Sequence, residues 1–154
     1  MCTKQRLPLG ARERFFWLLD QQRPVHFSKA VEVAGHYLSD QWYQALGIVQ
    51  QQHALLSAAI QINSNKVPEF TIQASKPIAF KVVKVFDPDS WGKELEQDAA
   101  QRFNSISPPL LIAEVYESDN SSVNSLSVHH AISDGRSLIF LLGDLLNAMN
   151  GRLV

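Results

Sequence analysis

The feature that most constrains the fold of this chain is a strand pattern that runs directly into a helix pattern. Leu126, Val128 and His130 alternate with Ser127 and His129, and successive side chains of a strand point to opposite faces. The alternation predicts that His130 lies on an apolar face and that His129 lies with the serines on the other. Because desolvation disfavours the charged form of histidine, the apolar face favours a neutral imidazole at His130.

A helix over residues 135–149 is expected to follow the strand at once. Ser133 or Asp134 can cap it, because a side-chain oxygen there can accept from the free N–H groups of the first turn, and Gly151 is suited to end it. The helix is apolar nearly all round, and such a helix needs burial on most sides. We therefore expect part of it to be covered by another domain, another copy of the chain or a missing half.

Composition narrows the class of protein. The chain has 154 residues, of which 45% are hydrophobic and 19% charged, as in a globular protein, and we expect residues 1–154 to form one domain. The net charge of -1 gives no reason to expect nucleic-acid binding, and the one cysteine, Cys2, excludes an internal disulfide and a cysteine metal cluster. Every apolar run is too short to span a membrane and the first ten residues lack a signal-peptide core, so the expected location is the cytoplasm.

Periodicity and turn residues divide the rest of the chain into further elements. We expect an N-terminal helix within 7–21, a helix over 40–53 capped by Ser39 or Asp40, and a helix that begins at Asp87 and ends before Pro108. The third helix carries an apolar stripe that we expect to be buried, formed by Trp91, Leu95, Ala99 and Phe103. Strands are expected at residues 25–35, 55–62, 67–73, 78–85, 110–117 and 123–130, the last two as an antiparallel hairpin.

The residues His129, His130, Asp134 and Gly135 spell His-His, three residues, Asp-Gly. This spelling, between a strand and a helix, resembles the active-site motif of the CoA-dependent acyltransferase superfamily. The superfamily includes chloramphenicol acetyltransferase, condensation domains of nonribosomal peptide synthetases, polyketide-associated acyltransferases, alcohol acetyltransferases and wax-ester synthases, whose two similar halves meet at the motif. The resemblance implies an α/β (α+β), chloramphenicol acetyltransferase-like half-domain with a mostly antiparallel sheet covered by helices, the N-terminal half of a two-lobed enzyme.

Two other stretches resemble the superfamily. The N-terminal helix carries charged residues before an aromatic pair, Phe15 and Phe16, as in the family's first motif. The junction at residues 51–60 is similar to an Arg-His-Glu-x-Leu-Arg-Thr-like stretch of condensation enzymes, which His53 and Leu56 match. We interpret His53 as structural, because nothing acidic or nucleophilic lies beside it in the sequence.

The two arginine positions of that stretch are occupied by Gln52 and Ser57. In many relatives the second arginine pairs with the motif aspartate, which Ser57 cannot do. Asp134 is therefore expected to bind another arginine, such as Arg136 or one from a missing part, or to act as a helix cap alone. The absence of both arginines favours O-acylation over peptide synthesis.

Acyl transfer requires the attacking hydroxyl or amine to lose its proton, and a neutral imidazole suits this task near pH 7. His130 is therefore the candidate general base, the role that the resemblance assigns to the second histidine. We expect His129 to support it, Asp134 to be structural, and Gly135 to let substrate approach.

The donor would be an acyl-CoA or a carrier-bound phosphopantetheine thioester, and we expect no tightly bound cofactor. We expect no metal, because adjacent strand histidines face opposite sides.

The predicted function is thus acyl transfer to an alcohol or amine by a half that needs a second lobe and is inactive alone. Two alternatives stay open: a non-catalytic half-domain that serves for association, and a fragment of an amide-forming condensation domain. The expected partners are the thioester, the acceptor and the second lobe, with neither nucleic acid nor a membrane span.

Overall fold

The computed structural model describes residues 5–35, 37–72, 76–85, 87, 90–100, 103–119 and 121–152. Cys2, Pro88 and Asp89 lie outside these residues. The expected α/β class is confirmed, because the described chain alternates helices with strands that form two sheets. None of the described helices combines the length and the apolar character that a membrane span requires.

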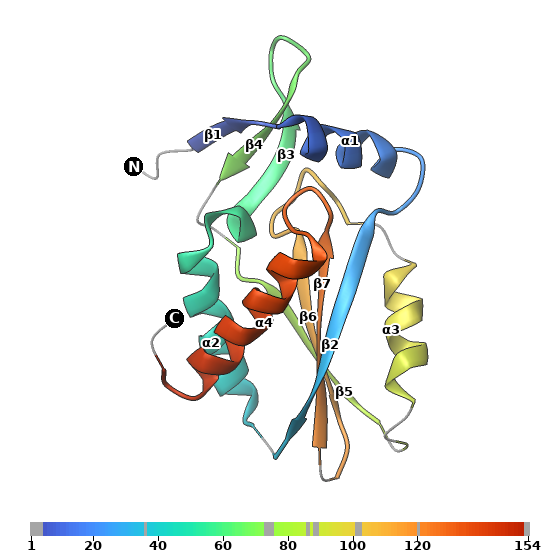
Figure 1. The fold of residues 1–154 in the computed structure, drawn as a ribbon, viewed down its shortest axis with the longest axis vertical. Helices are drawn as coiled ribbons and strands as arrows, with labels where there is room; N and C mark the ends of the chain where they lie inside the picture. Colours follow the sequence, from blue (N-terminus) through green and yellow to red (C-terminus); the bar gives the residue numbers. More distant parts are fainter. Residues whose placement is uncertain are drawn as a thin grey trace.

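The larger sheet has the strand order β2-β7-β6-β5 (Figure 1). Strand β7 (Ser121–His129) is antiparallel to β2 (His26–Ala34) and to β6 (Leu111–Glu117), whereas β5 (Ala79–Lys84) runs parallel to β6. The predicted hairpin is confirmed, although β7 begins inside the expected turn because its first residue already pairs with the end of β2. The sheet is therefore mostly antiparallel, as expected.

Helices cover both faces of this sheet. Helices α2 (Ser39–Gln52) and α4 (Gly135–Met149) pack side by side on one face (Figure 1), and α3 (Trp91–Ala99) packs on the other, where the ring of Trp91 lies 6.4 Å from that of Tyr116. The core under α2 and α4 includes Trp42, Leu46, Val49, Leu126, Val128, Leu138 and Leu145. The alternation of β7 thus places its apolar residues where the sequence predicts.

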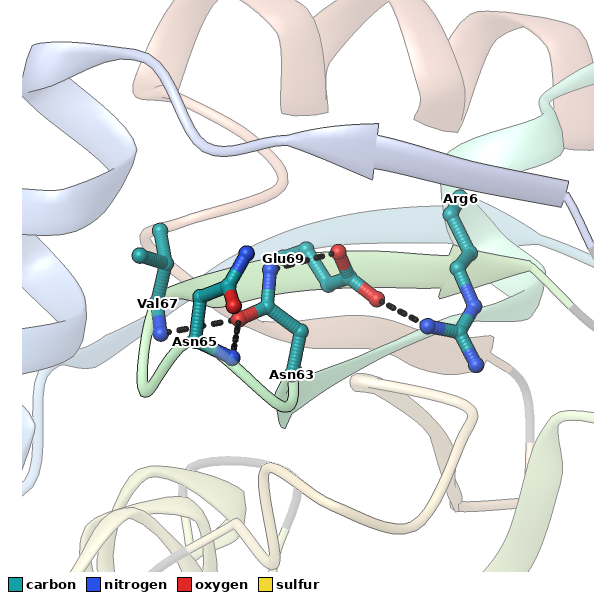
Figure 2. Close-up of polar contacts among 5 residues, drawn as sticks. All are labelled: Arg6, Asn63, Asn65, Val67 and Glu69. Carbon is teal, nitrogen blue, oxygen red and sulfur yellow. Dashed lines mark hydrogen bonds and ion pairs between the residues drawn. The ribbon is translucent and has the colours of Figure 1, made fainter.

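The smaller sheet has the order β1-β4-β3, all antiparallel, from β1 (Gln5–Pro8), β3 (Ala58–Ile62) and β4 (Pro68–Ile72). Figure 2 shows how its hairpin closes: the Asn63 Oδ1 accepts from the backbone N–H groups of Asn65 and Val67, at 2.9 and 3.0 Å. Glu69 accepts from the Asn63 amide at 3.1 Å and binds Arg6 at 3.0 Å. These bonds tie β1 to the hairpin.

A second, smaller core joins this sheet to the larger one. Its buried members are Ala58, Ile60, Phe70, Leu110 and Ala131. Ile132 packs against both cores. Because Ala131 and Ile132 follow the two histidines, the motif turn lies where the two cores meet.

Several expected boundaries are wrong. Helix α1 (Ala11–Asp20) lies within the expected residues 7–21. Strand β1 before it was not foreseen, and residues 54–57 form a 3-10 turn, η1 (Ala54–Ser57), so that β3 begins only at residue 58. Helix α2 begins at Ser39, which leaves neither Ser39 nor Asp40 as its cap. Leu38 precedes the helix, and its backbone N–H donates to the Gln41 side chain at 2.8 Å.

Helix α3 also differs from the expectation. It begins at Trp91, and the carbonyl of Asp87 accepts from the N–H of Ser90 at 3.0 Å, so Asp87 lies before the first turn. Of the predicted stripe, Trp91, Leu95 and Phe103 are half-buried. The burial is incomplete because, within the described residues, α3 covers its face of the sheet alone.

Candidate active site

The backbone of the motif turn is held at both ends. The N–H of His129 donates to Leu110 and that of His130 to Val25, each at 3.0 Å, and the N–H of Ile132 donates back to His129 at 3.1 Å. Backbone bonds to two different neighbouring segments leave the turn little freedom. The positions of both imidazoles are therefore set by the sheet.

The imidazole of His130 lies between two phenyl rings. The Phe16 ring of α1 is stacked on it at 4.4 Å with 9° between the planes, and the Phe27 ring of β2 contacts it at 4.3 Å and 35°. Phe27 pairs with Val128 in the sheet. The prediction that His130 lies on an apolar face is therefore confirmed.

This setting decides the protonation state of His130. Burial lowers the pKa of the imidazole below its ordinary value of 6.5, and the Arg12 guanidinium lowers it further, whereas a backbone hydrogen bond with Ser133 and the Asp134 charge oppose the shift. Desolvation penalises the charged form. The imidazole is neutral at pH 7.

His129 points to the opposite side of the strand and is fully buried. Its Nδ1 accepts from the N–H of Ala131 at 3.0 Å, so the proton of the neutral ring is on Nε2. Nε2 lies 3.6 Å from the Asp20 Oδ2, and the other Asp20 oxygen accepts from the N–H of Val25 at 3.2 Å. Burial lowers the pKa of His129, although the Asp20 carboxylate opposes the shift.

Asp134 caps α4: its Oδ1 accepts from the N–H of Ser137 at 2.8 Å, and this bond is the main cause of the lowered pKa of its carboxyl. Its arginine partner is Arg12 of α1, whose two terminal nitrogens each lie 3.4 Å from Oδ2. The suggested partner Arg136 instead lies over the ring of Phe140, at 5.9 Å. Arg12 of the N-terminal helix thus takes the place of the arginine that is absent at position 57.

Gly135 occupies the first position of α4. A Cβ there would meet the Cε of Lys29 at 3.9 Å, which is ordinary van der Waals contact. The described chain therefore gives no reason why this position must be glycine, and the role in substrate access stays a prediction.

A groove of about 490 Å³ lies beside the motif turn, between the C-terminal end of α2 and the exposed side of α4. It is lined by Gln52, His53, Ala54, Leu55, Leu56, Ile132, Ser133, Ser137, Phe140 and Leu141. His53 binds Asp144 of α4, with 2.9 Å between Nε2 and Oδ2. The fold therefore brings an acidic residue, Asp144, beside His53, although none lies near it in the sequence.

The sequence did not identify the residues that surround the two histidines. Phe16, Phe27 and Arg12 surround His130 and its turn, and Asp20 faces His129. The aromatic pair of the first motif was the available signal for Phe16. The partners on β2 and at the end of α1 come from distant parts of the chain and carry no local pattern.

No protein-family model matches the chain. Nonribosomal peptide synthetase 8 of Aspergillus fumigatus is 23% identical to it over 144 residues, and the polyketide synthase PksN of Bacillus subtilis is 24% identical over 153 residues. These matches cover 90% and 92% of the chain but 2% and 3% of the two relatives. The chain therefore spans a small fraction of the curated relatives that it matches.

Solved structures extend the comparison to the fold. The first condensation domain of the CDA synthetase matches with a TM-score of 0.86 at 17% identity, over 99% of this chain and 43% of that one. The condensation domain of the polyketide synthase MokA matches with a TM-score of 0.85 at 12% identity, over 97% of this chain and 35% of that one. The X-domain from teicoplanin biosynthesis matches with a TM-score of 0.83 at 24% identity, over 99% of this chain and 35% of that one. The chain therefore has the fold of these condensation domains, as the resemblance of its motif predicts.

Proposed function

We propose that the chain supplies the general base of an acyltransferase, and that His130 is this base. The observation that carries the proposal is the neutral imidazole held between the rings of Phe16 and Phe27. Such an imidazole can accept the proton of a hydroxyl or amine as it attacks a thioester carbonyl. The proton then passes from the imidazolium to the leaving sulfur, so the thiol departs neutral and no covalent acyl-enzyme is needed.

The other motif residues would act through position. His129 anchors the turn from below by accepting a hydrogen bond from Ala131 and by its contact with Asp20, and Asp134 fixes the start of α4 and holds Arg12. Precise placement of a base is worth orders of magnitude in rate, because small displacements of the reacting groups are costly. These residues are therefore positioning residues, and His130 is the catalytic residue.

The donor in this proposal is an acyl group on a phosphopantetheine thioester, carrier-bound or as CoA. Similarity to a peptide synthetase and a polyketide synthase favours the carrier-bound form. The acceptor is an alcohol or an amine. The lack of an arginine at position 57 favours an alcohol acceptor only if Asp134 has no arginine partner. Arg12 is such a partner. The residue at position 57 therefore does not distinguish O-acylation from amide formation.

A second lobe would complete the site. Helix α4 buries Leu138 and Leu145, yet Ile139 and Phe140 on its outer side are 57% and 63% exposed. Exposed large apolar side chains next to a groove are typical of surfaces that another element covers. The same observation supports the second candidate, a non-catalytic half-domain used for association. Light scattering that shows a stable monomer, together with no thioester binding, would contradict both candidates.

The test is thioester turnover by the full-length protein carrying His130→Ala. Loss of a general base should lower the rate by about 10²–10⁴-fold. Ser125→Ala is the matched control, because this serine lies on the same strand, is buried, and has a hydroxyl without a hydrogen-bond partner. An undiminished rate in His130→Ala would exclude His130 as the base.

A further inference from the structure

One side of α4 leads from the motif turn to a histidine–aspartate pair. Ser137, Leu141 and Asp144 are spaced at i, i+4 and i+7, and such positions share one side of a helix. At 1.5 Å per residue, Asp144 lies about 10 Å further along α4 than Ser137. Ser137 and Leu141 line the groove, and so does His53, the partner of Asp144. The groove therefore extends from the turn that carries His130 to a polar pair.

The lining between these two ends is apolar. Leu55, Ile132, Phe140 and Leu141 contribute the large side chains, which suit an alkyl chain. The volume of about 490 Å³ is in the range of small-molecule sites, which combine a mostly apolar wall with a few placed polar groups. His53 is the titratable residue of this wall within the described residues, and Asp144 stands behind it as its hydrogen-bond partner.

The chemistry of the pair defines what it can recognise. When the Nε2–H of His53 donates to Asp144 at 2.9 Å, the Nδ1 of a neutral ring is an acceptor, and the second carboxylate oxygen of Asp144 is another. A plain alkyl end would remove water from these acceptors without replacing its hydrogen bonds, which is unfavourable. A hydroxyl or an amide N–H would satisfy them.

We infer that this groove binds the acyl chain of the donor, and that His53 and Asp144 select chains with a hydroxyl or amide N–H about 10 Å beyond Ser137 along α4. The inference rests on the proposed acyl transfer and adds a substrate class to it. His53 and Asp144 are specificity-determining residues in this assignment, and take no part in the proton transfer at His130.

The experiment compares two pantetheine thioesters of equal, medium chain length, one with a plain alkyl end and one with a terminal hydroxyl. Binding of each to this chain is measured by titration calorimetry. We expect the hydroxylated chain to bind about 10-fold more tightly, as one well-satisfied hydrogen bond allows. In His53→Leu and in Asp144→Asn this preference should disappear, whereas the affinity for the plain chain should stay the same or rise.

Two controls separate this inference from the proposed function. Asp40→Asn makes the same chemical change as Asp144→Asn in the first turn of α2, at the opposite end of that helix from His53, and should keep the preference. His130→Ala should also keep it. Equal affinity of the native chain for the two thioesters, binding of neither, or an unchanged preference in both groove variants would overturn the inference. If turnover depends on His130 but the chain shows no preference between the two thioesters, His130 remains the proposed base and only the inference about the groove fails.

Discussion

Replacement of His129 by leucine tests the support beneath the proposed base. Leucine fills a similar buried volume but removes both polar ring atoms. The N–H of Ala131 loses the acceptor that it has at 3.0 Å, and the Asp20 carboxylate loses the Nε2–H at 3.6 Å while keeping the N–H of Val25. Both stranded groups are in the interior, since Ala131 is 4% exposed and Asp20 is 5% exposed.

The expected cost follows from these two losses. A buried donor left without an acceptor costs about 1–3 kcal/mol. The Asp20 carboxylate lies 3.6 Å from the neutral His129 ring, too far for a hydrogen bond, so loss of this contact adds about 1 kcal/mol. His129→Leu should therefore lower the free energy of unfolding by about 3 kcal/mol, and the melting temperature by about 6–12 °C.

Urea unfolding at pH 7, followed by circular dichroism, measures the cost. Ser125→Ala is the matched control on the same face of β7, and it should change the free energy of unfolding by less than about 0.5 kcal/mol because its hydroxyl has no partner. Asp20→Asn added to His129→Leu should recover part of the loss, because the stranded carboxylate is then neutral. A loss in His129→Leu no larger than in Ser125→Ala would refute the reasoning.

Two further predictions concern stability. His129 and His130 both have a pKa below 6.5 in the folded chain. The unfolded chain therefore binds more protons as pH falls below about 6.5, and the free energy of unfolding should drop there by linkage. Denaturation series at pH 7.5 and about 5.5 measure this drop, and an equal free energy at the two pH values would contradict the shifts. Leu138→Ala should cost about 3–5 kcal/mol because the side chain is fully buried. Its neighbour Ile139, 57% exposed, should tolerate alanine; equal losses would contradict the orientation of α4.

The elements that the sequence predicts best are those that local patterns determine. Helix α4 occupies the expected residues 135–149, because its cap Asp134, its apolar run and the glycine at 151 all lie in one continuous stretch of sequence. Strand β1 was missed because it is a short polar segment whose partner, β4, is far away in the chain. The segment Ala54–Ser57 has the apolar run of a strand but forms a 3-10 turn, a difference that hydrophobic pattern alone does not encode.

In the candidate site, too, local patterns predicted some features and contacts between distant residues determined the rest. Alternation along β7 was enough to place the two imidazoles on opposite faces. Their surroundings come from contacts across the chain: Arg12 and Asp134 are 122 residues apart, and His53 and Asp144 are 91 residues apart. A single sequence carries no local signal for such pairs. The sequence therefore predicted the cap and an arginine partner for Asp134 but suggested Arg136 in place of Arg12, and it predicted no partner for His53.

The stacking of Phe16 on His130 makes the basicity of one side chain depend on tertiary closure. Helix α1 lies near the start of the chain and the motif near its end, so the pKa of His130 depends on a contact between distant segments. Undocking of α1 would open one side of the ring to water, remove part of the desolvation and raise the pKa towards 6.5. The docked helix therefore keeps residue 130 less basic than the same histidine in an open chain.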